Sequence, residues 1–312
     1  MTTTLLDGVV NVGARPFPQD ALGDDTVVIR PDYMGICRAD AKEILGSRDV
    51  MEDRGPLFGH ELVGTVAFAG SRTGFAEGDL VTLNPNITPS RTTGFAEYVF
   101  VHDTRERLDQ AVVRVPEPHI RDGIWMPEPF ACIVHALGKL LEHTRLPSLQ
   151  GKSVGILGAG CAGLMFAMYA RHLGASVSVF NRGGAARVRA GPGDPRRGRD
   201  IRPVGRGGGG APGPVRRRDR GDHRRHGAAP GDSRRHGGRR RGPVRLRRHA
   251  QGRQLPAGRA DVDTLRRQER IESVRHLGKR LRIAGAYGCF REDYEEGFRL
   301  HADHPRAFPW RS

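Results

Sequence analysis

Short apolar runs separated by turn-forming residues occupy the first third of this 312-residue chain. Runs this short, bounded by Gly, Pro, Asp and Asn, are typical of strands rather than helices. The pattern predicts strands at residues 27–29, 61–68, 80–83 and 96–101. We therefore expect residues 1–121 to form a β-rich domain.

The period of the apolar positions changes after this domain. Ile133, Leu137, Leu140 and Leu141 recur at helical spacing, which predicts a helix within residues 122–146. A strand, a glycine-rich turn, a helix and a second strand then follow one another in about thirty residues, the length of a compact β-α-β unit. Their predicted bounds are 153–157 for the first strand, 164–173 for the helix and 176–180 for the second strand.

The turn contains Gly158, Gly160 and Gly163 in a G-x-G-x-x-G pattern. In this context the first glycine permits a tight turn, and the second lets a pyrophosphate approach the backbone. The third lets the helix lie close to the strand. Free N–H groups at the start of the helix would then face the phosphates. The unit predicts dinucleotide binding, and a plain packing turn is the alternative.

Residues 184–260 break the pattern. They hold 18 Gly, 8 Pro and 23 Arg, with no Lys, Glu or aromatic residue, and show neither helical nor strand periodicity. Such a segment buries too little apolar surface to offset the entropy of ordering, so we expect it to be disordered. Three interpretations are open: an Arg/Gly-rich nucleic-acid-binding arm, a flexible linker, or a G+C-rich gene read out of frame. The frameshift best explains why the segment starts directly after the second strand.

The same segment accounts for the net charge of +16. Its 23 Arg against 5 Asp contribute +18, so the rest of the chain is nearly neutral. The segment also lacks aromatic side chains on which bases could stack. We therefore expect no nucleic-acid partner, although the charge alone would suggest one.

The cysteine content and the N-terminal sequence indicate the cellular compartment in which the protein is expected. The four cysteines, at positions 37, 132, 161 and 289, are too few and too scattered for a disulfide framework, which favours a reducing cytoplasm. The N-terminus lacks the basic and apolar regions of a signal peptide, and no apolar run approaches the roughly eighteen residues of a membrane span. We expect a soluble cytoplasmic protein with no membrane partner.

Cys37, His60, Glu61 and Glu128 offer donor atoms for a metal ion. A thiolate, an imidazole and a carboxylate make a reasonable catalytic zinc set with one position open. Zinc would act as a Lewis acid that lowers the pKa of a bound alcohol, which favours hydride release to a nicotinamide. Each residue alone also has a structural interpretation, such as a buried thiol, a turn cap or a salt-bridge partner. Their order ahead of the glycine turn favours the zinc site.

Several motifs together resemble the zinc-type alcohol dehydrogenases of the medium-chain dehydrogenase/reductase family. They are Gly35-Ile-Cys37 with Asp40, Gly59-His60-Glu61, Gly78-Asp79, Gly94-Phe-Ala-Glu-Tyr98, Glu128-Pro129 and the glycine turn. The resemblance covers residues 25–182 and, more loosely, 261–309. It implies an α/β protein in which a GroES-like catalytic domain is followed by a Rossmann dinucleotide-binding domain.

The resemblance also implies where the domains lie. The GroES-like domain would be residues 1–121, the first part of the Rossmann domain 122–183, and its remainder 261–312, truncated at its end. The insert at 184–260 would leave the Rossmann domain incomplete, so we expect the chain as written to be inactive. In the last segment the pattern predicts a helix over residues 262–274, a strand over 280–284 and a helix over 294–301.

By the same resemblance, Cys37, His60 and Glu128 would bind one catalytic zinc, with Glu61 as a ligand or close neighbour. Asp40 would orient His60. Two features depart from many relatives: residues 84–93 contain no cysteines for a structural zinc, and Ala39 replaces a hydroxyl residue that relays the alcohol proton. Another group or water must then carry that proton.

The end of the second strand bears on the cofactor. Asn181-Arg182 stands where a carboxylate usually binds the ribose 2′-hydroxyl. Loss of that acceptor, with an Arg able to meet a 2′-phosphate, favours NADP over NAD. A solvated Arg182 is the structural alternative.

The finer likeness is to the 2-deoxy-scyllo-inosamine dehydrogenases of aminoglycoside antibiotic biosynthesis, on residues 35–40, 53–61 and 284–288. It implies oxidation of 2-deoxy-scyllo-inosamine to 3-amino-2,3-dideoxy-scyllo-inosose. We expect a zinc- and NAD(P)-dependent oxidoreductase acting on a secondary alcohol of a polyol or aminocyclitol, homo-oligomeric in the intact family member. The alternatives are a zinc-free NADP-dependent reductase of the same fold and an Arg/Gly-rich nucleic-acid-binding protein.

Overall fold

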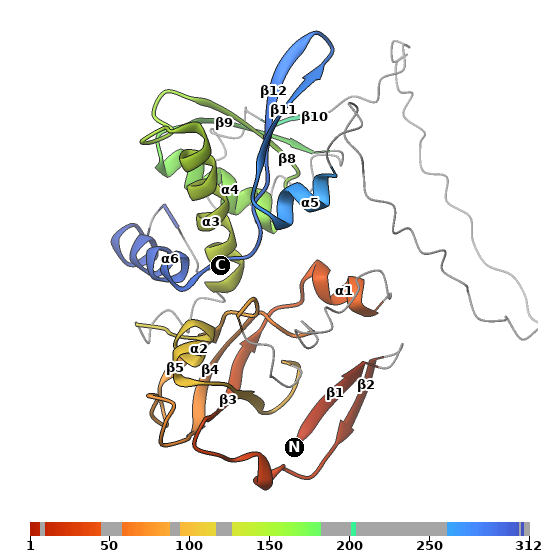
Figure 1. Cartoon of the computed structure of the whole chain (residues 1–312), viewed down its shortest axis with the longest axis vertical. Helices are drawn as coiled ribbons and strands as arrows, with labels where there is room; N and C mark the ends of the chain where they lie inside the picture. Colours follow the sequence, from red (N-terminus) through yellow and green to blue (C-terminus); the bar gives the residue numbers. More distant parts are fainter. Residues whose placement is uncertain are drawn as a thin grey trace, which may run out of the picture. The chain divides into compact units, whose positions relative to one another are not determined.

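The computed structural model (Figure 1) describes residues 1–6, 10–44, 58–87, 94–116, 127–181, 201–203, 261–305 and 307–308. The chain divides into two units, Met1–Val204 with Ala250–Ser312, and Gly205–His249. Every described residue belongs to the first unit, and the second lies outside the described residues.

A five-stranded antiparallel sheet forms the N-terminal domain, with the strand order β6-β3-β4-β5-β7. The strands are β3 (Thr26–Met34), β4 (Leu62–Ala69), β5 (Leu80–Leu83), β6 (Val99–His102) and β7 (Val112–Arg114). The four predicted strands are confirmed as β3 to β6. Successive residues of a strand point to opposite faces. Val27, Ile29, Leu62 and Val81 accordingly share one buried core.

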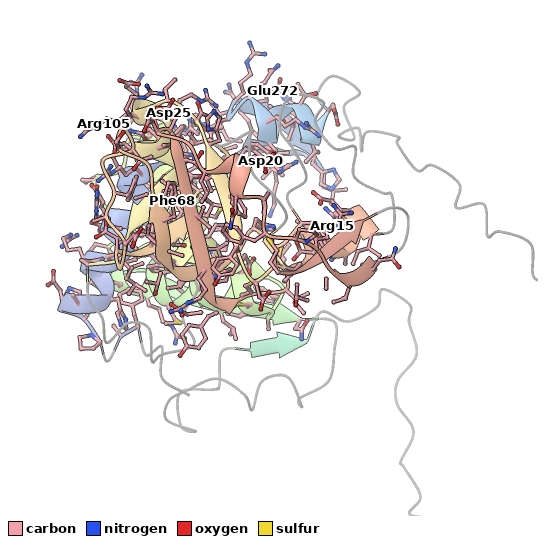
Figure 2. The ribbon with its side chains drawn as sticks, turned by 90° about the horizontal axis from the view of Figure 1, so that it is seen from below. Arg15, Asp20, Asp25, Phe68, Arg105 and Glu272 are labelled. Atoms are coloured by element: carbon pink, nitrogen blue, oxygen red, sulfur yellow. The ribbon has the colours of Figure 1, made fainter. Side chains whose placement is uncertain are left out.

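Shorter elements surround this sheet. They are the antiparallel pair β1 (Thr2–Leu6) and β2 (Val10–Ala14), the 3-10 helix η1 (Gln19–Ala21), α1 (Arg38–Ile44) and α2 (Arg105–Ala111). Arg72 donates to both carboxylate oxygens of Asp25 and so ties the turn after β4 to the start of β3. Asp25, and Phe68 of β4, are labelled in Figure 2. The sequence pattern did not anticipate the β1–β2 pair.

The predicted strand–turn–helix–strand unit is confirmed, and with it the α/β fold class. It consists of β8 (Ser153–Leu157), α4 (Cys161–His172) and β9 (Ser176–Asn181), and the two strands pair in parallel. A third parallel strand, β10 (Ile201–Pro203), pairs with β9 to give the order β10-β9-β8. β10 lies inside the segment expected to be disordered, so that expectation is wrong for these three residues. The other residues of the segment lie outside the described residues.

The C-terminal segment forms α5 (Val262–Arg267), β11 (Ile271–His276), β12 (Lys279–Ala284) and α6 (Arg291–Asp303). The predicted strand at 280–284 and the helix at 294–301 are confirmed. The helix expected over 262–274 is wrong beyond Arg267. Glu269 has a φ of +49°, which ends the helix, and the β-branched residues that follow enter β11. Within the described residues, β11 and β12 pair only with each other.

The long helix α3 (Pro127–Thr144) confirms the helix expected within 122–146 and organises the second core. Phe130 of α3 is fully buried, with its ring 6.0 Å from that of Tyr169 in α4 and 5.5 Å from that of Phe308. Gly297 of α6 also packs against the ring of Phe130. This core therefore joins α3, α4 and α6. None of the helices in the described ranges is long and apolar enough to cross a membrane.

Candidate functional site

Three of the predicted ligands meet at one place. Cys37 directly precedes α1, and His60 and Glu61 directly precede β4. The Sγ atom of Cys37 lies 3.4 Å from Nε2 of His60. One donor atom from each of Cys37, His60 and Glu61 lies within 4.8 Å of the others. We call these three residues the CHE group.

Asp40 contacts the chain segments on both sides of the CHE group. Its Oδ1 lies 3.4 Å from Nδ1 of His60 and accepts a 2.9 Å hydrogen bond from the backbone N–H of Gly59. Its Oδ2 accepts a 2.7 Å hydrogen bond from the backbone N–H of Cys37. One buried carboxylate thus fixes both chain segments and leaves Nε2 of His60 directed at Cys37. A carboxylate on the second ring nitrogen is the usual support of a metal-binding imidazole.

The electrostatics of the CHE group favour a bound positive charge. Burial would lower the pKa of His60, but hydrogen bonds with Asp40 and Cys37 and the nearby charge of Glu128 raise it to about 11. Burial would likewise raise the pKa of Asp40, yet His60 and the two backbone N–H groups lower it. Burial raises the pKa of Glu61, against the effect of His60. A proton or a metal cation is therefore stabilised at this point.

Glu128 stands in the first turn of α3 and contacts a different set of residues. Its Oε1 lies 3.5 Å from Sγ of Cys132, and Cys132 Sγ lies 3.8 Å from Sγ of Cys289. The three donor atoms lie within 4.8 Å of one another, and we call these residues the ECC group. Burial raises the pKa of Glu128 to about 6, with opposing effects from the charges of His60 and Glu61. Glu128 is thus within electrostatic reach of the CHE group, while its carboxylate contacts the thiol of Cys132.

The glycine turn has the geometry that its sequence predicts. Gly158 has a φ of +119°, which L residues with a side chain rarely adopt. A Cβ atom on Gly163 would collide with the carbonyl oxygen of Gly158, so the helix approaches the strand as closely as the pattern implies. Helix α4 begins at Cys161, after Gly160. Burial, with a smaller effect of the charge of Glu61, raises the pKa of the Cys161 thiol at this helix start.

Comparison with known proteins identifies the N-terminal domain. Residues 23–115 match the alcohol dehydrogenase GroES-like domain. The match shows a likeness of this part of the chain to the zinc-type alcohol dehydrogenases. The chain is 28% identical over 198 residues to sorbitol dehydrogenase of Bombyx mori, covering 56% of this chain and 55% of the relative. It is 27% identical over 183 residues to an uncharacterized zinc-type alcohol dehydrogenase-like protein of Haemophilus influenzae, covering 53% and 52%.

Among solved structures, galactitol-1-phosphate dehydrogenase from Escherichia coli matches with 24% identity and a TM-score of 0.47. The match covers 61% of this chain and 57% of that one. The chain spans about half the length of the curated relatives it matches.

The structure describes one of the two residues predicted to bind the cofactor at the end of β9. Asn181 ends β9, and its Nδ2 is buried without a hydrogen-bond partner in the described part of the chain. An orphaned donor at this end of the strand fits an oxygen of a bound ribose or phosphate. Arg182 lies outside the described residues.

Cys132 and Cys289 were not among the residues predicted from the sequence to be functional. The Glu128-x-x-x-Cys132 spacing was a usable signal, because residues four apart share one face of a helix. No local sequence pattern indicates Cys289, because it lies 157 positions after Cys132, the residue that it contacts.

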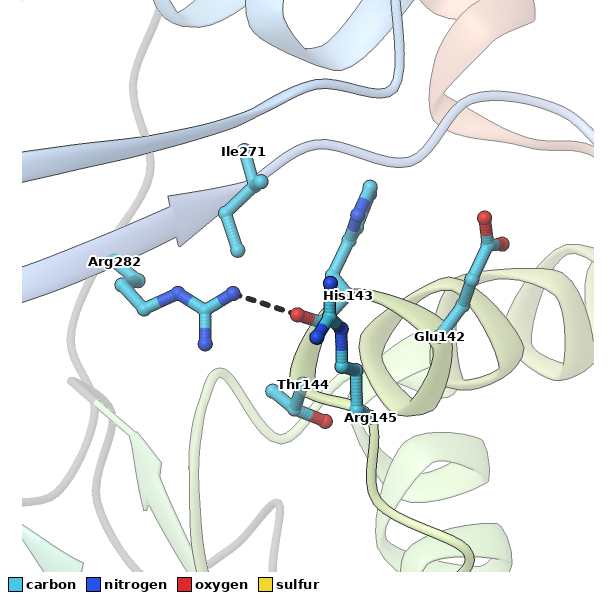
Figure 3. Close-up of a pocket in the computed structure, with 6 residues that line it drawn as sticks. All are labelled: Glu142, His143, Thr144, Arg145, Ile271 and Arg282. Atoms are coloured by element: carbon cyan, nitrogen blue, oxygen red, sulfur yellow. Dashed lines mark hydrogen bonds between the residues drawn. The ribbon is translucent and has the colours of Figure 1, made fainter.

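A separate pocket has no residue in either group. Glu142, His143, Thr144, Arg145, Ile271 and Arg282 line it, at the end of α3 and beside β11 and β12 (Figure 3). Arg282 donates a 2.6 Å hydrogen bond to the carbonyl oxygen of His143. This contact ties the β11–β12 pair to α3, which gives the pocket a structural explanation.

Proposed function

We propose that the whole protein is a zinc- and NAD(P)-dependent dehydrogenase that oxidises a secondary alcohol of a polyol, cyclitol or sugar-like substrate. The observation that carries the proposal is the CHE group with buried Asp40 behind His60. The same chain carries the glycine turn of a dinucleotide-binding unit. A metal site for an alcohol and a site for a nicotinamide are the two parts that hydride transfer requires.

The CHE group fits zinc in both chemistry and dimensions. Zinc–sulfur and zinc–nitrogen bonds at a tetrahedral angle place the two ligand atoms about 3.5 Å apart. The observed separation between Cys37 Sγ and His60 Nε2 is 3.4 Å. Zinc bound there would supply Lewis acidity toward the substrate oxygen. Cys37, His60 and Glu61 would hold it, and the role of Glu128 as a ligand remains a proposal that requires its carboxylate to leave Cys132.

The protein's own groups define the rest of the site. Asp40 keeps the Nδ1 proton of His60 and so leaves Nε2 available as a donor atom. The backbone N–H of Ala39 lies 3.1 Å from Cys37 Sγ and stabilises a thiolate there. Because Ala39 has no hydroxyl group, the alcohol proton must leave through Glu61, Glu128 or water. Both carboxyl groups have a raised pKa, which favours proton acceptance.

The glycine turn and Asn181 support a dinucleotide cofactor, and Asn181-Arg182 supports NADP. The relative from Bombyx mori is named a sorbitol dehydrogenase, which supports a polyol as the substrate class. The finer proposal is 2-deoxy-scyllo-inosamine as substrate in aminoglycoside biosynthesis, supported by the motif resemblance at residues 35–40, 53–61 and 284–288.

The test uses the protein with its reading frame restored through 184–260. We expect zinc-dependent reduction of NADP with a cyclitol or polyol from a panel that includes sorbitol, myo-inositol and 2-deoxy-scyllo-inosamine. Activity that survives a Cys37→Ser/His60→Ala double variant would instead indicate a zinc-free reductase of the same fold. Salt-dependent binding of RNA or DNA at physiological ionic strength, without cofactor binding, would support the nucleic-acid alternative.

A further inference from the structure

We propose that the ECC group, Glu128 with Cys132 and Cys289, is a second metal site that takes a thiophilic divalent cation of the zinc class. The observation behind it is a dithiol and a carboxylate converging inside the second core, where the CHE group has no ligand atom. The inference goes beyond the proposed dehydrogenase activity and does not depend on it.

The separations between the donor atoms match a tetrahedral zinc site. Two zinc–sulfur bonds at a tetrahedral angle place the sulfurs about 3.8 Å apart, and one sulfur and one carboxylate oxygen about 3.6 Å apart. The observed separations are 3.8 Å between the two Sγ atoms and 3.5 Å between Cys132 Sγ and Glu128 Oε1. Three ligands are therefore already at bonding separation for one ion.

The fold holds these three ligands from separate segments. Glu128 and Cys132 lie four residues apart on one face of α3. Cys289 comes from the segment between β12 and α6, where Gly288 has a φ of +71° and packs against Asn86. The side chain of Asn84 donates a 3.1 Å hydrogen bond to the carbonyl oxygen of Cys289. Cys289 is thus fixed in place by residues outside its own segment.

The surroundings suit metal-bound thiolates. The amide nitrogen of Asn86 lies 3.9 Å from Cys289 Sγ and would donate to its thiolate, as groups around a bound metal commonly do. Cys289 is 2% exposed and Glu128 7% exposed. When they bind an ion as thiolates, two buried sulfurs beside a carboxylate would have their negative charge compensated by a divalent cation.

Glu128 links this site to the CHE group. While its carboxylate binds an ion at the ECC group, it is not available to a zinc held by Cys37 and His60. Occupation of the second site therefore assigns the first site to Cys37, His60 and Glu61. The donor atoms of these three residues are the ones that lie within 4.8 Å of one another in the structure.

The experiment needs no variant at its first step. The full-length protein with its reading frame restored through 184–260, reduced with a phosphine that does not bind metal strongly, is alkylated with and without Co²⁺, and each cysteine is followed by peptide mass spectrometry. We expect Co²⁺ to slow alkylation of Cys132 and Cys289 by about tenfold or more, because a metal-bound thiolate is a poor free nucleophile. Exposed Cys161 is the internal control and should be unaffected.

Variants then separate the two sites. A Cys37→Ser/His60→Ala variant should keep a thiolate-to-cobalt absorption band, which then comes from Cys132 and Cys289. A Cys132→Ser/Cys289→Ser variant should lose that part of the band. Equal alkylation of both cysteines with and without Co²⁺ would overturn the proposal. The proposal would also be overturned if a thiol titration found two more thiols after reduction than before it. Cys132 and Cys289 would then form a disulfide in place of the metal site. If the Cys37→Ser/His60→Ala variant keeps dehydrogenase activity, the dehydrogenase proposal loses its zinc site and the proposal for the ECC group is unaffected.

Discussion

Oδ1 of Asp40 lies 3.4 Å from Nδ1 of His60, the ring nitrogen that does not face Cys37. The same carboxylate accepts hydrogen bonds from the backbone of Cys37 and Gly59, so it joins the two segments that carry the proposed zinc ligands. Asp40 is 1% exposed, which leaves water little access to replace it. Its role is therefore to position His60 and Cys37 relative to each other.

Asp40→Asn should weaken zinc binding by about 10- to 100-fold, because loss of a carboxylate behind a ligating histidine typically costs that much affinity. Zinc retention against a graded chelator series measures the effect. Asp20→Asn, an exposed change in η1, is the matched control and should leave retention unchanged. Equal retention in Asp40→Asn and the unchanged protein would remove Asp40 from the metal site.

His135 of α3 should make stability depend on pH. Its Nε2 lies 2.6 Å from Glu269 and its Nδ1 lies 3.0 Å from Asp293, at the first turn of α6. The hydrogen bond with Asp293, opposed by burial and reinforced by Glu269, raises the pKa of His135 above its usual value of about 6.5. The stabilisation is fully present below that usual value and is lost as the pH rises through the raised pKa.

Thermal or urea unfolding followed from neutral pH into the alkaline range checks this directly. His135→Gln should flatten the decline on the alkaline side and lower the free energy of unfolding by about 1–3 kcal/mol, since two carboxylates lose a charged partner. Arg299→Gln, which removes an exposed ion pair with Glu296 in α6 and leaves both partners of His135 in place, is the control. A His135→Gln profile parallel to that of the unchanged protein would contradict the assignment.

The frame-restored enzyme should prefer NADP over NAD. Arg182→Ala should reduce kcat/KM for NADP by about 10- to 100-fold, as expected for loss of a hydrogen bond to a charged group, with little effect on NAD. Arg171→Ala, an exposed change in the last turn of α4, serves as the control. An equal or higher kcat/KM for NAD in the unchanged enzyme would refute the argument from Asn181-Arg182.

Resequencing the gene between the codons for Arg182 and Asp261 should reveal a shifted reading frame. Within the described residues, β8 pairs only with β9, and Leu157 at its end is 84% exposed. An unpaired strand edge with exposed apolar residues promotes aggregation. Expressed side by side, the frame-restored protein should be soluble and unfold cooperatively, and the chain as written should aggregate and lack dehydrogenase activity. Soluble, active protein from the chain as written would argue against the frameshift.

Local pattern alone was sufficient for most of the secondary structure. The strands β3 to β6, the unit β8–α4–β9 and the helices α3 and α6 follow from apolar spacing and glycine positions, because these reflect contacts within a few residues. The pattern failed at 262–274, where a positive φ at Glu269 ends the helix before the apolar period does. It also missed β7, which has three residues and is ordered mainly by pairing with β5.

The residue types of the candidate site were likewise evident in the sequence, but their partners were not. Only the tertiary structure brought Cys37 to His60 and Glu61, turned Glu128 toward Cys132, and carried Cys289 to both across 157 residues. The physical reason is that ligand grouping depends on how β4, α3 and the segment before α6 pack together. Hydrophobic burial sets that packing over the whole core, and no local spacing encodes it.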